Sequence, residues 1–254
     1  MSEAVLTERR DGVLIITINR PEARNAINLD VAHGIAAGLD ELDGDAQLAL
    51  GVLTGAGSGF SAGMDLKAFA EGKRPWVEGR GFAGIVRKPS RKPLIAAIEG
   101  FAVAGGLEVA LACDLLVAAR GAKLGTPEAK RGLVAAGGAL LRLPRRIPYH
   151  FAMEMALTGD LYPAERLYEV GLVNRIAEPG QALETALELA GAIAQNAPLS
   201  LRGSKRILEH APEWPLREMW DRQEEISGPI FASADAREGA VAFAEKRAPD
   251  WQGK

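Results

Sequence analysis

Residues 100–119 read GFAVAGGLEVALACDLLVAA, and Glu108 lies in the middle of this stretch among small and apolar side chains. The segment PLIAAIEG (93–100) that leads into it predicts a buried strand. GGLEVALACD (105–114) predicts a helix, and LLVAA (115–119) predicts a second strand. Strand, helix and strand in succession indicate an α/β core with parallel strands. A carboxylate in such a core is costly to bury unless another group compensates it, so Glu108 needs a reason.

The chain before this stretch continues the same alternation. Residues 4–19 predict a hairpin that turns near Asp11 and Gly12, a pair suited to the positive φ angles of tight turns. Asn28 is placed to cap a helix, because apolar residues follow it at three- and four-residue steps: Val31, Ile35, Leu39 and Leu42. Residues 48–55 predict another short buried strand.

From about Gly137 onward the pattern becomes mostly helical, broken by proline and glycine. Only GLVNRIAE (171–178) is typical of extended chain in this part. We therefore expect an α/β core over residues 1–195 and a helical region over 196–254 that packs on the core or on another subunit.

Composition excludes several classes of protein. Of the 254 residues, 48% are hydrophobic, the net charge is −3, and basic and acidic residues are interspersed. Such a chain lacks the basic face that a nucleic-acid backbone requires. The single cysteine, Cys113, cannot form an internal disulfide, which fits a cytoplasmic location. The three histidines have no ligand-like spacing, so we expect no metal site.

Neither the beginning of the chain nor its most apolar run predicts a membrane segment. MSEAVLTERRDG lacks the basic start and apolar core of a signal peptide. The run over 93–119 is interrupted by Glu99, Glu108 and Asp114, which disfavours a lipid-spanning helix.

Glycine-rich segments follow two of the expected strands. GSGFSA (57–62) has the form GxGxxA, but a short helical turn and a polar loop follow it, which disfavours a dinucleotide site. SAGMDL (61–66) and VAGGLE (103–108) each open a helical turn. Amides at such positions lack internal partners, and two that converge on one oxygen would stabilise negative charge on a carbonyl.

Five motifs in order along the chain resemble those of the crotonase, or enoyl-CoA hydratase/isomerase, family. They are NRPEARNAIN (19–28), GSGFSAGMDLKAF (57–69), the stretch 93–119, AKLGTPEAKRGL (122–133) and REGAVAFAEKRAPDW (237–251). The resemblance implies a spiral of ββα units with a C-terminal helical region that supports trimerisation, as a homotrimer or a dimer of trimers. It also implies an oxyanion hole made by the backbone N–H groups of Met64 and Gly105.

By the same resemblance, Glu108 and Glu128 match the two glutamates with which hydratases of the family hold one water. Adding water across an α,β-unsaturated thioester requires a base for the water and an acid for Cα, while the thioester oxygen gains negative charge. We expect Glu108 to activate the water and Glu128 to deliver the proton. The substrate implied is an acyl-CoA thioester, and no cofactor is expected because the addition of water is redox-neutral.

The resemblance also implies a set of CoA-binding residues: Arg24, Ala62, Asp65, Leu66, Lys67, Phe243 and Lys246. Taken by themselves, Asp65 is typical of a helix cap, and Lys67 of a surface residue placed near a CoA phosphate. The chain departs from the family at Ala104, where many relatives have glycine, and at AAGGA (135–139), which lacks a proline and ends in Ala139.

Two alternatives stand beside the hydratase. The family also catalyses other acyl-CoA reactions, such as double-bond isomerisation, on the same oxyanion hole. A non-catalytic acyl-CoA-binding protein would keep the pocket without needing both glutamates.

Overall fold

A six-stranded sheet forms the centre of the computed structural model, which describes residues 3–254. Residues 1 and 2, at which the expected N-terminal segment and core begin, lie outside the described residues. The strand order is β1-β2-β3-β6-β8-β11, and every pair except β1 and β2 is parallel. The strands are β1 (Val5–Arg10), β2 (Val13–Ile18), β3 (Leu50–Gly55), β6 (Leu94–Ile98), β8 (Leu115–Ala119) and β11 (Arg175–Ala177).

Local sequence explains the first elements. Asp11 and Gly12 have φ angles of 50° and 76°, as a tight hairpin turn requires, and they join β1 to β2. The side chain of Asn28 accepts a hydrogen bond from the Val31 N–H at the start of α1 (Leu29–Gly44). The predicted hairpin and helix cap are therefore confirmed.

Helices cover both faces of the sheet. The apolar stripe of α1, which includes Ile35 and Leu39, joins the larger core cluster together with side chains of β2 and β3. The alanines of α7 (Ala182–Ala194) pack with strand residues such as Val52 in the second cluster. Parallel strands with both faces covered form the α/β core that the alternating pattern predicted.

A smaller sheet brings several motif segments together. Its order is β10-β9-β7, made by β7 (Phe101–Val103), β9 (Lys123–Gly125) and β10 (Tyr162–Pro163). These short strands were not predicted, because three residues carry no readable periodicity. After β7 comes α3 (Gly105–Ala110), which is shorter than the helix expected over 105–114, because the chain turns through 111–114 to enter β8.

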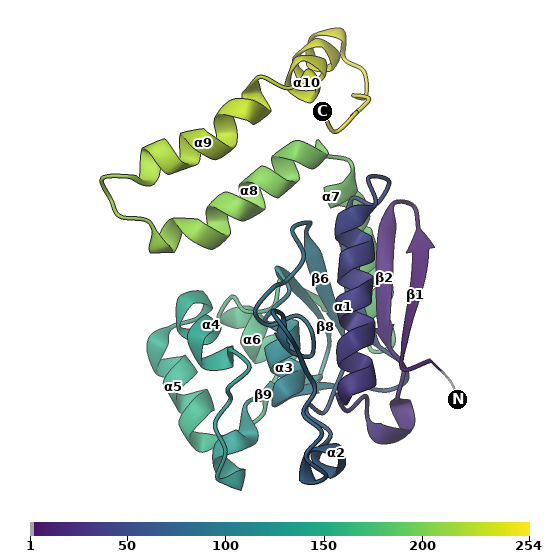
Figure 1. Ribbon diagram of the computed structural model, residues 1–254, viewed down its shortest axis with the longest axis vertical. Coiled ribbons are helices and arrows are strands. Elements are labelled where there is room, and N and C mark those ends of the chain that lie inside the picture. The colour runs from purple at the N-terminus through teal and green to yellow at the C-terminus, as the bar shows by residue number, and fades with distance from the viewer. Residues whose placement is uncertain (1–2) are drawn as a thin grey trace.

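The remaining elements surround these sheets. The segment between β3 and β6 contains α2 (Leu66–Ala70), β4 (Trp76–Val77) and β5 (Gly81–Phe82). One-turn 3-10 helices are η1 (Pro21–Ala23), η2 (Pro127–Arg131) and η3 (Ala211–Glu213). To the left of α3 in Figure 1 lie α4 (Ala139–Arg146) and α5 (Tyr149–Thr158), and α6 (Ala164–Glu169) lies between α4 and β8 in this view.

The C-terminal helices lie at one end of the molecule. Figure 1 shows α8 (Pro198–His210), α9 (Met219–Phe231) and α10 (Ala234–Glu245) at the top of the view, and α2 at the bottom. The predicted division at residue 195 falls between α7, which packs on the sheet, and α8. None of the helices described over residues 3–254 has the length and apolar character to cross a membrane.

Candidate active site

Two backbone amides from separate segments lie next to each other. A Cβ built on Gly105 would lie 3.4 Å from the Met64 nitrogen, and one built on Gly63 would lie 2.9 Å from the Gly105 nitrogen. Within residues 3–254, neither the Met64 nor the Gly105 N–H donates to a protein acceptor. The structure therefore brings together two free donors, the arrangement that an oxyanion hole needs.

The two amides lack an acceptor within residues 3–254 for different reasons, which follow from their positions in the backbone. Gly105 is the first residue of α3, where an N–H has no partner inside the helix. Met64 precedes α2 and its cap Asp65, so it lies outside the first helical turn in which the sequence had placed it. Flanking bonds from the Ile27 N–H to the Gly63 oxygen and from the Asp65 N–H to the Ile27 oxygen hold it in place.

Ala104 occupies a conformation that favours glycine. Its φ of 54° and ψ of −128° lie where a side chain is disfavoured, and its Cβ lies 3.2 Å from the Cβ position built on Gly63. This residue ends the tight turn between β7 and α3 that presents the Gly105 N–H. The alanine that departs from the family pattern is therefore a site of backbone strain beside the free amides.

Glu108 lies on the first turns of α3 and is 5% exposed. Its Oε1 accepts a hydrogen bond from the Ala139 N–H at 3.2 Å. A Cβ built on Gly137 would lie 2.5 Å from its Oε2, so the loop passes directly against the carboxylate. The pKa of Glu108 is raised to about 7. Burial is the main cause and the negative charge of Glu128 adds to it, while the hydrogen bonds from the Ala139 and Gly137 amides oppose the shift.

Glu128 lies in η2, which follows β9, and is half-buried. Its Oε2 is buried and has no hydrogen-bond partner within residues 3–254, and the same holds for the Thr126 hydroxyl. Burial also raises the pKa of Glu128. Because these two buried oxygens lie two residues apart and have no partner within residues 3–254, they indicate a place where a water or a substrate oxygen completes the hydrogen bonding.

Most of the expected CoA-binding residues gather beside the two amides. The Ala62 N–H donates to the Arg24 oxygen at 3.0 Å, which joins the first motif to the second. The Arg24 guanidinium lies over the ring of Phe101, 4.6 Å from its centroid. Asp65 caps α2 and forms an ion pair with Arg20 at 3.0 Å, and both Leu66 and Lys67 are exposed.

Phe243 and Lys246 lie elsewhere. Phe243 is exposed on α10, and Lys246 ends that helix with a positive φ. Within one chain, Figure 1 shows α10 and α2 at opposite ends of the molecule. The chain does not bring these two residues to the other candidate residues of its own site.

Several residues that shape the site were not predicted. The amides of 137–139 reach Glu108 across about thirty residues of sequence. The ring of Phe82 covers Gly105, with its Cζ 2.6 Å from the built Cβ. Asn25 is buried and donates to the Ala56 and Gly59 oxygens, which fixes the loop before Met64. Two sequence signals pointed toward them: the asparagine inside the first motif, and the AAGGA segment (135–139), whose contact with Glu108 was not predicted.

Comparison with known proteins identifies the family to which this chain belongs. The sequence profile described as enoyl-CoA hydratase/isomerase matches residues 8–254. The chain belongs to the enoyl-CoA hydratase/isomerase family. The family and fold class expected from the five motifs are thereby confirmed.

Relatives named for an activity are similar to this chain over nearly their whole length. Enoyl-CoA hydratase EchA19 of Mycobacterium tuberculosis is 42% identical over 260 residues, covering 98% of this chain and 96% of the relative. Carnitinyl-CoA dehydratase of Escherichia coli K12 is 39% identical over 262 residues, with full coverage of both chains. The crystal structure of an enoyl-CoA hydratase from M. tuberculosis H37Rv superposes with a TM-score of 0.98 at 56% identity, again with full coverage.

Proposed function

We propose that this protein is an enoyl-CoA hydratase in which Glu108 and Glu128 act on one water molecule. The observation that carries the proposal is the pair of acidic side chains, both with a raised pKa, together with two adjacent backbone amides that have no acceptor within residues 3–254. Relatives named enoyl-CoA hydratase and carnitinyl-CoA dehydratase confirm the expected reaction class, the addition or removal of water on an acyl-CoA.

The chemistry follows from the placement of these groups. The thioester oxygen accepts hydrogen bonds from the Met64 and Gly105 N–H groups, which stabilise the negative charge that develops as the enolate forms. Ionised Glu108 takes a proton from water, whose oxygen bonds to C3 of the enoyl group. Protonated Glu128 gives its proton to C2, and the carbon–carbon double bond becomes single. The reverse sequence eliminates water.

Burial prepares both acids for these roles. A base works best when its pKa is near the working pH, and the pKa of Glu108 is raised to about 7. The Ala139 and Gly137 amides still favour its ionised form. The negative charge of Glu128 raises the pKa of Glu108, so the two titrations are coupled and a proton held by the pair belongs to both carboxylates.

The CoA moiety would lie along Arg24, Ala62, Asp65, Leu66 and Lys67, which border the Met64 amide. Because Phe243 and Lys246 lie at the far end of the chain, they would contact the CoA of a neighbouring subunit. Exposed apolar side chains on the last helices and in the turn before α9 support a homotrimer or a dimer of trimers: Leu208, Leu216, Trp220, Phe231 and Phe243. We place this assembly in the cytoplasm, consistent with the single free, buried cysteine.

The test follows loss of the conjugated enoyl-thioester absorbance with crotonyl-CoA and a longer enoyl-CoA. Glu108→Gln and Glu128→Gln preserve shape but remove the proton transfers, so each should lower kcat by about 10²–10⁴. Glu188→Gln, on the exposed face of α7, is the matched control and should match wild type. A wild-type protein that binds acyl-CoA but hydrates no enoyl-CoA would refute the hydratase and favour the binding protein.

A further inference from the structure

A second cleft lies between the core and α8, away from the thioester site. It has a volume of about 370 Å³ and contains none of the proposed catalytic or CoA-binding residues. Its wall comes from the end of α1, the loop before β6 and one face of α8: Asp43, Arg91, Lys92, Arg202, Arg206, Glu209 and His210.

Positive charge dominates this wall. Four of the lining side chains are formally positive and two are negative, which gives +2 with His210 neutral. Arg202, Arg206 and His210 follow one another at four-residue steps, so they form a stripe on one face of α8. Like charges at this spacing repel one another and destabilise a helix.

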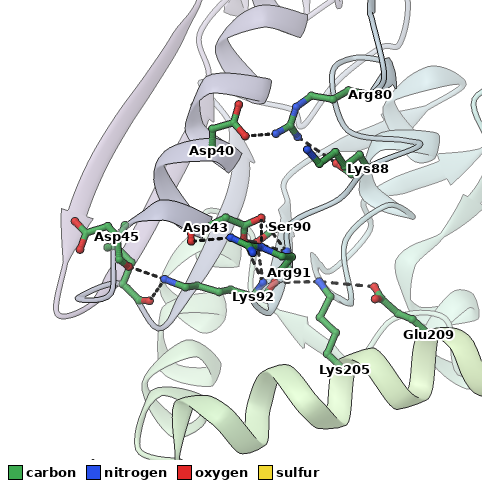
Figure 2. A network of polar contacts seen from close by, with 11 residues as sticks. Asp40, Asp43, Asp45, Arg80, Lys88, Ser90, Arg91, Lys92, Lys205 and Glu209 are labelled. Atoms are coloured by element: carbon green, nitrogen blue, oxygen red, sulfur yellow. Dashed lines mark hydrogen bonds and ion pairs between the residues drawn. The ribbon is translucent and has the colours of Figure 1, made fainter. Parts of the chain in front are cut away.

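The two carboxylates of the wall are already engaged. Asp43 accepts hydrogen bonds from the Ser90 hydroxyl at 2.6 Å and from the Arg91 N–H at 2.9 Å, as Figure 2 shows. Glu209 lies 3.8 Å from the Lys205 ammonium, which also donates to Asp114 at 2.7 Å. Neither acid is free to neutralise the stripe.

Arg91 is paired with Asp43 at 3.6 Å, but the two arginines that α8 turns toward the cleft have no carboxylate partner within residues 3–254. Within the described residues, neither Arg202 nor Arg206 forms an ion pair or a side-chain hydrogen bond, and both are exposed to the cleft. The Lys92 ammonium is buried and donates to the Asp45 and Leu48 oxygens, both at 2.6 Å. Burial lowers the pKa of Lys92, and the nearby charge of Arg202 lowers it further.

We propose that this cleft binds a small phosphate-bearing anion, which neutralises the Arg202–Arg206 stripe and stabilises the contact of α8 with the core. Two guanidinium groups one helical turn apart suit the oxygens of a phosphate or diphosphate, because each can donate two parallel hydrogen bonds. A cleft of about 370 Å³ is at the small end of ligand sites and fits a diphosphate group rather than a complete acyl-CoA. The diphosphate could be inorganic or belong to a nucleotide, since both present the same oxygens.

The experiment measures binding of inorganic pyrophosphate and of ADP by calorimetry, and the thermal midpoint with each ligand. The Arg202→Gln/Arg206→Gln variant should bind the preferred ligand at least about tenfold more weakly, because each charge-assisted bond contributes more than 1 kcal/mol. Pyrophosphate should raise the Tm of wild type and leave that of the variant unchanged. Arg237→Gln, an exposed arginine on α10, is the matched control and should bind like wild type.

The two ligands distinguish the source of the diphosphate: equal affinity indicates the inorganic ion, and tighter ADP binding that depends on the two arginines indicates a nucleotide. Either absence of saturable binding by wild type or undiminished binding by the folded double variant would overturn the proposal. Hydration of enoyl-CoA by the double variant, measured alongside, should equal that of wild type, since these arginines lie outside the thioester site.

Discussion

Adding one methyl group at Gly137 should slow the enzyme about 100-fold while leaving it folded. In the structure the new Cβ would lie 2.5 Å from Oε2 of Glu108 and 2.8 Å from its Cδ. Ordinary contact begins at 3.4 Å, so the carboxylate or the loop must move by about 0.9 Å. Displacement of a catalytic group by about 1 Å costs on the order of 100-fold in rate, so Gly137→Ala should lower kcat by about that factor.

The loss should appear in kcat more than in KM, because the proposed CoA-binding residues lie in other segments. The assay follows the enoyl-thioester absorbance at saturating substrate, with circular dichroism to monitor folding. Gly191→Ala is the matched control: it lies on α7 with nothing within 4 Å of the built Cβ, and should leave kcat unchanged. A folded Gly137→Ala variant with the kcat of wild type would refute the view that this loop holds the Glu108 carboxylate in place.

Three further predictions concern the same region. The pKa of Glu108 is raised from 4.5 to about 7, so the buried carboxyl destabilises the folded protein as pH rises through that interval. Glu108→Gln should therefore be more stable than wild type at pH 8. Thermal melts should show this difference vanish toward pH 4. Ala104→Gly should raise the free energy of unfolding by about 1 kcal/mol in urea titrations, because it relieves a positive φ at some entropic cost in the unfolded chain. Thr126→Val keeps the shape of a buried side chain whose hydroxyl has no partner among residues 3–254, so it should leave the melting temperature nearly unchanged. We expect it to lower kcat by about tenfold, because the hydroxyl is placed to bind the water; a kcat equal to that of wild type would count against this role.

The sequence predicted the features that depend on neighbouring residues. The turn at Asp11 and Gly12 and the Asn28 cap both follow from side-chain chemistry within a few positions. The parallel sheet follows from the alternation of apolar runs with helical ones. Family motifs, rather than periodicity, located Met64 and Gly105, which the structure places side by side.

Features that depend on distant segments could not be predicted in this way. Ala139 donates to Glu108 across 31 positions, and Lys205 reaches Asp114 across 91. No local pattern marks either contact, because each depends on how helices and loops pack in three dimensions. The strain at Ala104 was hidden for a related reason: an alanine in the sequence gives no sign of its φ angle.

Because of its position, the Cys113 thiol can report local opening of the structure through its reactivity. The thiol is fully buried at the junction of α3 and β8, and burial raises its pKa, so it does not react as a thiolate in the closed state. A thiol reagent would therefore modify this chain only when the end of the Glu108 helix separates from the sheet. The rate of that modification, with and without acyl-CoA, would measure how often the end of α3 separates from the sheet, at a single site and without any introduced label.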